Sequence, residues 1–387
     1  MTPARKPARR RTSRTRIPPR PVDFAEVLHH RVEGLAAGEP ISPPIVHASA
    51  FHLPGSTEAA NQYGRWDNGT WRALEEALGV LEDAETAMFP SGMAAIAAVL
   101  LSQLRPGQRA LLPLDGYGAT QAMARQYLVP SGIHVDFCFT PQIPERDLEG
   151  YDLVFVESPS NPLLRVIDIA QLAERAHAAG ALLVVDNTMM TPLGQRPLEL
   201  GADVVVASDT KALAGHTDVL GGHVASKNGQ LMVGVRHWRT LTGGILGPME
   251  AWLIHRGLDT LEVRLERMWS TAQALGEMLE SLGGQFPFTS VVFPGLDSHP
   301  DAEIVAAQMA GPGSLVGVEF ETAEIAERFL AASRYLVAAT SFGGTHSSAE
   351  RRARWDDDVQ DGYVRISVGC EPTPALLEDV VLALQSL

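Results

Sequence analysis

Three short apolar runs in the middle of the chain constrain the fold more than any other feature. They are "YDLVFVE" at 151–157, "ALLVVD" at 181–186 and "ADVVVAS" at 202–208, and the amphipathic stretch "IAQLAERAHAAG" at 169–180 lies between the first two. Continuous valine and leucine runs separated by helices are typical of strands that are buried on both faces of a parallel sheet. The sequence therefore predicts an α/β fold with a mostly parallel sheet.

The pattern changes near residue 246, which we take as a domain boundary. A long helical stretch, "MEAWLIHRGLDTLEVRLERMWSTAQALGEMLESLGG", is followed by separated strands such as "SLVGVEFE" and "GYVRISVG" and by a last helical stretch, "PALLEDVVLALQSL". The chain has 387 residues, and single cores rarely grow past about 250–300 residues, so two domains are expected. We predict a large domain at 61–245 and a smaller C-terminal α+β domain at 246–387.

The first twenty residues form a separate, basic segment. They carry eight Arg or Lys side chains and no acid, whereas the whole chain has a net charge of −15. Because the segment contains several prolines and few apolar residues, we predict a disordered basic leader at 1–22. An organellar transit peptide or a nucleic-acid arm is the alternative. The acidic remainder argues against a nucleic-acid partner elsewhere.

Cysteine usage and hydropathy exclude other classes of protein. Cys138 and Cys370 form neither a CxxC pair nor a disulfide framework, so we expect a reducing compartment, namely the cytoplasm. The longest apolar stretch, "MAAIAAVLL", is too short to span a bilayer, so we predict no membrane segment.

Polar side chains follow each of the three apolar runs. Ligands of open α/β sheets bind outside the carboxyl ends of the strands, where these side chains would gather. The sequence therefore predicts an active site around the lone lysine of this group. The group comprises Glu157, Asn161, Asp186, Ser208, Thr210 and Lys211.

The stretch "FPSGMAAIAAVLLSQL" at 89–104 predicts an anion site. Ser91 is suited to cap a helix, Gly92 leaves the backbone open to close approach, and the residues from Met93 onward favour a helix. Free N–H groups and the helix dipole would then face a phosphate group. An ordinary capped core helix is the alternative.

A lysine and an acid at strand ends, together with a phosphate site, point to a pyridoxal phosphate enzyme. This cofactor needs a lysine amine for covalent attachment, an acid that keeps the pyridine nitrogen protonated, and hydroxyl and N–H groups for its phosphate. It also needs an aromatic face over the ring, for which Tyr117 in "LDGYGATQAM" is the candidate. A tyrosine in an ordinary turn is the alternative interpretation.

Seven motifs occur in a fixed order along the chain. They are "YGRWDNGTWRALEEALGVLE", "FPSGMAAI", "DGYGAT", "ESPSNPLLRVIDI", "VVDNTMMTPLGQRPLELGADVVVASDTKALAGHTDVLGG", "TSFGGTHS" and "YVRISVG". Together they resemble the cystathionine γ-synthase and γ-lyase family of fold type I pyridoxal phosphate enzymes, which act on sulfur amino acids. The resemblance covers nearly the whole chain after residue 40 and implies the PLP-dependent transferase-like fold.

The resemblance implies how the cofactor is held. Lys211 would carry the cofactor covalently, Asp186 would pair with its pyridine nitrogen, and Tyr117 would stack on its ring. Asn161 would lie beside the ring oxygen. The residues that would hold the phosphate are Gly92, Met93, Ser208 and Thr210, joined by Tyr63 and Arg65 from a neighbouring subunit.

The resemblance also implies an assembly and a substrate site. The active site of this family is completed across a dimer, its usual assembly is a homotetramer of two such dimers, and residues 23–60 would form an N-terminal arm that contacts the partner subunit. Arg365 would bind the substrate α-carboxylate, with Ser341 in the segment beside it. His346 and Gln121 would lie near the far end of the substrate.

The activity that the resemblance implies is γ-elimination, which converts cystathionine to cysteine, 2-oxobutanoate and ammonia. Lys211 would take the Cα proton, and Tyr117 or Lys211 would protonate the leaving sulfur. A γ-substitution, as in a cystathionine γ-synthase or an O-acylhomoserine sulfhydrylase, is the main alternative. A protein that binds the cofactor without catalysis is a further one.

Departures from the family pattern fall where substrate choice is decided. Gln62, Gln121, Ala122 and His346 occupy positions near the far end of the substrate, and none carries a permanent charge. The sequence therefore predicts weaker selection of the distal amino acid of cystathionine than in the usual lyase. Ala119 stands where methionine γ-lyases carry a distinctive Cys, which argues against a dedicated methionine γ-lyase.

Two rival classes of enzyme lack the required patterns. A nicotinamide dehydrogenase would have GxGxxG between a strand and its helix, whereas "GPGSLVG" precedes an apolar strand with the wrong spacing. A metal hydrolase could use Asp209, His216, Asp218 and His223, but the intervening glycines predict a loop rather than a fixed ligand set. We therefore predict no metal site.

Overall fold

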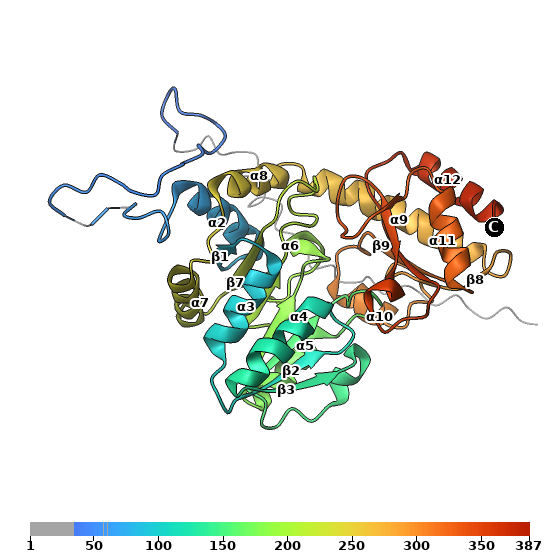
Figure 1. Cartoon of the computed structure of the whole chain (residues 1–387), viewed down its shortest axis with the longest axis horizontal. Helices are drawn as coiled ribbons and strands as arrows, with labels where there is room; N and C mark the ends of the chain where they lie inside the picture. The colour runs from blue at the N-terminus through green and yellow to red at the C-terminus, as the bar shows by residue number, and fades with distance from the viewer. Residues whose placement is uncertain (1–34, 57, 60) are drawn as a thin grey trace, which may run out of the picture.

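The computed structural model of the chain describes residues 35–56, 58–59 and 61–387 (Figure 1). The predicted leader at 1–22 and part of the predicted arm at 23–60 lie outside the described residues. Within the described ranges, no helix combines the length and the apolar character that crossing a bilayer would require.

The larger sheet of the described chain has seven strands in the order β1-β7-β6-β5-β4-β2-β3. Neighbouring strands are parallel except for β7, which runs antiparallel to β1 and β6. The apolar runs that we predicted as strands form β4, β5 and β6, so the mostly parallel sheet is confirmed. The strands are β1 (Glu85–Phe89), β2 (Arg109–Pro113), β3 (His134–Cys138), β4 (Leu153–Glu157), β5 (Leu182–Asp186), β6 (Val204–Ala207) and β7 (Gly222–Ser226).

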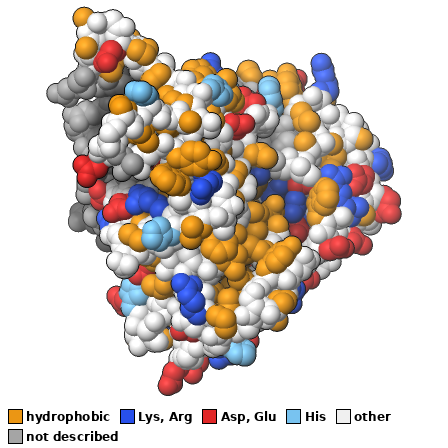
Figure 2. Space-filling view, turned by 60° about the vertical axis from the view of Figure 1, so that its left-hand side comes forward, with side chains coloured by type: hydrophobic (Ala, Val, Ile, Leu, Met, Phe, Trp, Pro, Cys, Tyr) orange, Lys and Arg blue, Asp and Glu red, His pale blue; other side chains and the backbone are white. Residues whose placement is uncertain are grey.

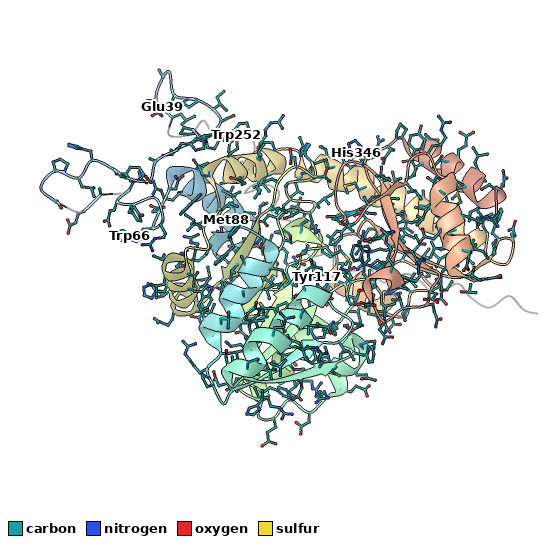
Figure 3. All side chains as sticks on the ribbon, viewed as in Figure 1. Glu39, Trp66, Met88, Tyr117, Trp252 and His346 are labelled. Carbon is teal, nitrogen blue, oxygen red and sulfur yellow. The ribbon has the colours of Figure 1, made fainter. Side chains whose placement is uncertain are left out.

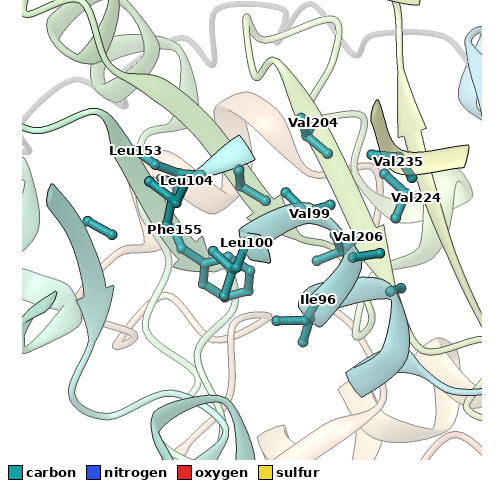
Figure 4. Packing of buried hydrophobic residues seen from close by; sticks show 14 of the residues in the cluster. Ile96, Val99, Leu100, Leu104, Leu153, Phe155, Val204, Val206, Val224 and Val235 are labelled. Atoms are coloured by element: carbon teal, nitrogen blue, oxygen red, sulfur yellow. The ribbon is translucent and has the colours of Figure 1, made fainter. Parts of the chain in front are cut away.

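Helices cover both faces of this sheet. On β4, Leu153 and Phe155 enter one buried cluster with α3 and α7 (Figure 4), and Val154 and Val156 enter another with α5. This alternation explains why the strands are apolar at every position. The helices of this part are α2 (Gly69–Glu82), α3 (Gly92–Gln103), α4 (Gly118–Met123), α5 (Ile169–Ala178), α6 (Thr191–Gly194), α7 (Gly229–Thr242) and α8 (Pro248–Leu258), with a π-helical turn at Ala124–Leu128 and 3-10 turns at Val129–Ser131 and Thr140–Glu145.

The C-terminal part is an α+β unit around a second sheet, as predicted. The sheet has five strands in the order β10-β11-β12-β9-β8 and is antiparallel except for the short pair β10 and β11. Its elements are α9 (Leu261–Ser281), β8 (Phe288–Val292), α10 (Ala302–Gln308), β9 (Leu315–Phe320), α11 (Ala323–Ala332), β10 (Val337–Ala338), β11 (Ser348–Arg351), a 3-10 turn (Arg352–Trp355), β12 (Tyr363–Ser367) and α12 (Thr373–Gln385).

The long helical stretch that we expected after residue 246 is divided into α8 and α9. Buried side chains of α8, such as Ile254 and Leu258, cluster with Leu74 of α2 in the large domain. The buried cluster of the C-terminal domain begins only at Ala272, halfway along α9. The domain boundary near residue 246 stays a prediction, and this packing favours a domain boundary inside α9.

Arg264 of α9 ties this helix to the segment that follows Lys211. Its guanidinium donates hydrogen bonds to the carbonyl oxygens of Ala212 (2.6 Å), Leu213 (3.2 Å) and Gly257 (2.7 Å). Burial lowers the pKa of Arg264. One buried side chain thus supplies donors to carbonyl groups of two separate segments and joins both of them to α9.

We expect Arg264→Met to destabilise the fold. Loss of the three hydrogen bonds should lower the free energy of unfolding by about 2–4 kcal/mol, because buried carbonyl groups that lose a donor are costly. Urea denaturation measures this change. The exposed Arg267 lies one turn further along the same helix, so Arg267→Met is the matched control. Equal midpoints for the two variants would contradict the role of Arg264.

Candidate functional site

A cavity of about 550 Å³ opens at the carboxyl ends of β4, β5 and β6. It brings together most of the side chains that the sequence singled out, from segments that lie far apart along the chain. Those predicted residues are Gly92, Met93, Tyr117, Asn161, Asp186, Ser208, Thr210, Lys211, Ser341 and Arg365.

One end of this cavity is a tightly packed backbone cradle. The Ser91 side chain accepts a hydrogen bond from the Ala94 N–H (3.1 Å) and so caps α3, as predicted. A Cβ atom at Gly92 would lie 2.6 Å from Ser208 Cβ, and one at Gly222 would lie 2.6 Å from the Gly92 nitrogen. The two glycines therefore let the start of α3 approach Ser208, where N–H and hydroxyl groups can hold a phosphate.

Lys211 lies at the centre of the cavity. Its Nζ donates a hydrogen bond to Ser341 Oγ (2.7 Å) and lies 4.9 Å from the centre of the Phe342 ring. Burial and the nearby positive charge of Arg365 lower the pKa of Lys211 to about 8. A substantial fraction of this amine is therefore neutral and nucleophilic near neutral pH.

Two carboxyl groups face each other on neighbouring strands beside Lys211. Glu157 ends β4, Asp186 ends β5, and the two residues are register partners. Burial raises the pKa of Asp186, and burial together with Asp186 raises that of Glu157 well above its usual range. Asp186 accepts a hydrogen bond from the Thr188 N–H (2.9 Å), whereas Glu157 accepts one from the Tyr117 N–H (2.9 Å). Glu157 thereby fixes the backbone of Tyr117, whose side chain is 47% exposed.

Arg365 is held by a buried acid that sequence reasoning missed. Its Nη2 donates to Glu350 Oε1 (2.8 Å) and to the Ser341 carbonyl oxygen (3.1 Å), and its Nη1 donates to Asn161 Oδ1. Its Nε is buried without a hydrogen-bond partner in the described chain. Glu350 could not be found from the sequence, because only the pairing of β11 with β12 puts it opposite Arg365.

Other unpredicted side chains line the same cavity. Arg352, Trp355 and Asp357 belong to the segment after β11 and form one wall. The Arg352 guanidinium is paired with both Glu350 and Asp357. A run of charges after a predicted strand was the only signal in the sequence, and such runs usually mark a solvated loop.

Four predicted residues lie outside this cavity. Tyr63 and Arg65 pack together near α7, where Arg65 donates to the Thr240 carbonyl oxygen. His346, which Figure 3 labels together with Tyr117, lines a second cavity that shares Thr210 and Ser341 with the first. Gln121 donates its amide N–H to the Leu114 carbonyl oxygen (2.8 Å) and lines a third cavity.

Two of the four residues of the metal-hydrolase alternative, Asp209 and His223, form an ion-pair cluster with Glu82 instead. The His223 ring lies 2.6 Å from Asp209 and 3.2 Å from Glu82. Although burial favours the neutral ring, these two carboxylates raise the pKa of His223 to about 10. In the part of the chain that is described, no group of three or more His, Cys, Asp or Glu side chains is arranged to hold a metal ion.

Comparison with known proteins identifies the class and then the family. A Streptomyces coelicolor protein provisionally named cystathionine gamma-lyase is 47% identical over 353 residues, which cover 89% of each chain. The O-succinylhomoserine sulfhydrylase of Pseudomonas aeruginosa is 38% identical over 87% of this chain and 86% of its own. The apo crystal structure of CalE6, a methionine gamma lyase from Micromonospora echinospora, has a TM-score of 0.86 and 38% identity and covers 93% of this chain and 98% of its own.

The fold and the cavity are those of a fold type I pyridoxal phosphate enzyme. Residues 27–385 match the family described as Cys/Met metabolism PLP-dependent enzyme. The chain belongs to this family, and it is a PLP-dependent enzyme of sulfur amino acid metabolism, as the motifs indicated.

The residues present fit the cofactor. The glycine cradle leaves room for a phosphate beside the Ser208 and Thr210 side chains. Buried Asp186 would be stabilised as a carboxylate by a protonated pyridine nitrogen, and Lys211 supplies the amine. The site therefore contains each chemical group that the cofactor requires.

We expect Gly222→Ala to weaken cofactor retention. The added methyl group would meet backbone atoms of Ser91 and Gly92, so the cradle must shift, at a cost of about 1–3 kcal/mol. Cofactor absorbance per subunit measures the cofactor content, and urea denaturation measures the loss of stability. Gly69→Ala is the matched control, because a Cβ atom there would make only ordinary contacts. Full cofactor content in Gly222→Ala would show that the cradle does not hold the phosphate.

Proposed function

We propose that the protein is a carbon–sulfur lyase that eliminates the γ-substituent of a sulfur amino acid, with cystathionine as the substrate that gives cysteine, 2-oxobutanoate and ammonia. The observation that carries the proposal is the partly buried Lys211, whose amine has a pKa lowered by burial and which shares one cavity with Arg365 and Tyr117. The provisionally named γ-lyase relative supports the same activity.

Two sets of residues would hold the cofactor: one set around its ring and another around its phosphate. Lys211 would carry it covalently, Asp186 would pair with the ring nitrogen, Asn161 would lie beside the ring oxygen, and Tyr117 would stack on the ring. When bound, pyridoxal phosphate supplies an electron-accepting ring that stabilises negative charge on the substrate Cα. The phosphate would be bound by Gly92, Met93, Ser208 and Thr210, all of which line the cavity.

Arg365 would orient the substrate by its α-carboxylate. Its buried Nε has no partner among the described residues, and Glu350 and Asn161 hold the rest of the guanidinium in place. A carboxylate on Nε would satisfy this donor with a charge-assisted hydrogen bond. Ser341, whose carbonyl oxygen accepts from Arg365, would border the same carboxylate.

Lys211 and Tyr117 would move the protons. With a pKa near 8, the Lys211 amine can accept the Cα proton and return it at a neighbouring carbon. Tyr117 is half-exposed and lines the cavity, where its hydroxyl would protonate the departing sulfur. Removal of a second proton, from Cβ, would then supply the electron pair that lets the bond from Cγ to sulfur break, and water would release ammonia and the 2-oxo acid.

A γ-substitution uses the same groups up to the loss of the leaving group. The O-succinylhomoserine sulfhydrylase relative favours this second candidate function. A thiol that arrives before product release would replace the leaving group instead of letting the remaining enamine hydrolyse. The product therefore distinguishes the two activities, and bound cofactor without turnover would indicate a catalytically inactive binding protein.

The assembly and location follow from the same proposal. The active unit would be a dimer within a homotetramer in the cytoplasm, with the described part of the 23–60 arm on the partner subunit. Tyr63 and Arg65 lie outside their own subunit's cavity, which is consistent with a role in the neighbouring one. Figure 2 shows apolar side chains gathered on one face of the described chain, which is consistent with a contact between subunits.

We expect cystathionine to yield equal amounts of cysteine, 2-oxobutanoate and ammonia. Lys211→Ala should lose at least about 10²-fold in turnover, because it removes the group that transfers the Cα proton. Mass spectrometry of products from cystathionine, cysteine, methionine and O-acylhomoserine plus a thiol measures this. The exposed Lys227, which pairs with Asp83, gives the control Lys227→Ala. If a thioether forms and no 2-oxobutanoate is released, the protein is a transferase and the lyase proposal is wrong.

We expect cofactor recombination to depend on pH through Lys211. Only the neutral amine attacks the cofactor, so in cofactor-depleted protein the rate should rise with pH, with a midpoint near 8, and level off at higher pH. For an exposed lysine the midpoint would lie at about 10.4. Absorbance after rapid mixing measures the rate. A midpoint near 10 would show that burial does not shift this amine.

A further inference from the structure

The third cavity, which Gln121 lines, has a volume of about 410 Å³ and adjoins the Lys211 cavity. The two cavities share Gly118, Trp355 and Asp357, so they meet at these residues. No lysine or arginine of the described chain lines this third cavity. We call it the acidic annex, because its walls carry the carboxyl groups of Asp115, Asp356, Asp357 and Asp358.

Asp115 gives the acidic annex a buried carboxylate oxygen without a partner. The residue is 6% exposed, and its Oδ1 accepts hydrogen bonds from the Thr140 N–H (2.7 Å) and the Thr140 hydroxyl (2.8 Å). Its Oδ2 is buried and accepts none from the described residues. A buried acceptor without a donor is costly, so a cationic N–H group that reaches this oxygen from the annex would be strongly favoured.

The nearby guanidinium does not offset this negative charge. Arg352 donates to Asp357 Oδ2 through Nε (2.7 Å), and its Nη1 pairs with Glu350. Because Glu350 also pairs with Arg365, Asp357 is the carboxylate that offsets the positive charge of Arg352. Asp115, Asp356 and Asp358 are left to give the annex a net negative charge.

The boundary between the two cavities is suited to an extended side chain. A Cβ atom at Gly118 would meet nothing within 4 Å, so the passage is open on that side. The Trp355 ring lies on the other side, is 52% exposed, and is held by a hydrogen bond from its Nε1 to Glu350 (2.8 Å). A thioether chain fixed at Arg365 could pass between them with its methylene groups against the ring.

We propose that the acidic annex binds an ammonium group at the far end of the substrate's leaving group, so that preferred substrates are sulfur amino acids with a second amine. This inference rests on the proposed lyase function and names its substrate class. It also revises the expectation that the far end of the substrate meets no permanent charge. The charges come from Asp115 and the 356–358 segment instead of Gln62, Gln121, Ala122 and His346.

Three thioethers with the same homocysteine end test this assignment on the holoenzyme. They are S-(2-aminoethyl)homocysteine, S-propylhomocysteine and S-(2-carboxyethyl)homocysteine, and each gives 2-oxobutanoate on γ-elimination. We expect kcat/KM to be about tenfold higher for the aminoethyl than for the propyl compound, as one charge-assisted hydrogen bond predicts. The carboxyethyl compound should be the poorest, because its charge is repelled.

Substitutions then assign the preference to the annex. Asp115→Asn should lower the aminoethyl to propyl ratio of kcat/KM about tenfold, since it removes the charge of the buried acceptor. Because Asp115 also holds Thr140, the exposed Asp358→Asn is a second variant, for which we expect a decrease of about threefold. Asp361→Asn, an exposed change outside the annex lining, should keep the wild-type ratio.

The outcomes separate this inference from the proposed function. If all three thioethers give 2-oxobutanoate at equal kcat/KM, or if both annex variants keep the wild-type ratio, the annex does not bind the amine and the lyase proposal stands. If none gives 2-oxobutanoate, the lyase proposal fails. In that case the aminoethyl and propyl compounds are compared by their dissociation constants, which are measured from the change in cofactor absorbance on titration. Equal dissociation constants would show that the annex does not bind the amine.

Discussion

Arg365 and Glu350 are register partners on β12 and β11, and both are almost fully buried, at 3% and 1% exposure. Their ion pair is 2.8 Å long, and the second Glu350 oxygen accepts from the Trp355 indole N–H. Removing either partner would leave a buried charge, at a cost of about 3–5 kcal/mol. The pair therefore fixes the position of the guanidinium, and with it the direction in which the unpartnered Nε points.

Both domains are needed to build the surroundings of Lys211. The lysine lies after β6 in the large domain, but its hydrogen-bond partner Ser341 and its ring neighbour Phe342 come from the C-terminal domain. Ser341 has a φ of 80°, which residues other than glycine rarely adopt, and a Cβ atom at Gly343 would lie 2.7 Å from the Ala212 nitrogen. Close packing of this loop on the lysine segment excludes water and so lowers the pKa of the amine.

The sequence predicts the cofactor side of the site better than the substrate side. Strand ends are marked by apolar runs that stop at polar residues, so the sequence alone assigns Asp186, Ser208 and Lys211 to one sheet edge. The Ser91 cap could be predicted because capping depends on neighbouring residues alone. The break between α8 and α9 was missed, because both helices keep the same apolar periodicity across Asp259 and Thr260.

Glu350, Arg352 and Asp357 could not be predicted because their roles depend on pairing between distant segments. A charged run such as "AERRARWDDD" is normally a solvated loop, yet here Glu350 is buried on β11, opposite Arg365 of β12. Gln121 donates its amide N–H to the Leu114 carbonyl oxygen of its own loop, a contact that the sequence does not show, and its place beside the substrate stays a prediction. Local patterns do not reveal which side chains the backbone has already engaged.

The position of the acidic annex separates catalysis from substrate choice. The cofactor cradle is built from backbone contacts between Gly92, Ser208 and Gly222, which tolerate little change. The annex acids at 356–358 lie in a turn after β11 that contributes nothing to that cradle, and Asp356 there adopts a left-handed conformation with a φ of 60°. Because the turn can change without moving Lys211 or Asp186, one catalytic centre could serve leaving groups of different charge within the same fold. The charge of the 356–358 turn, rather than the groups that move protons, would then decide which sulfur amino acid is cleaved.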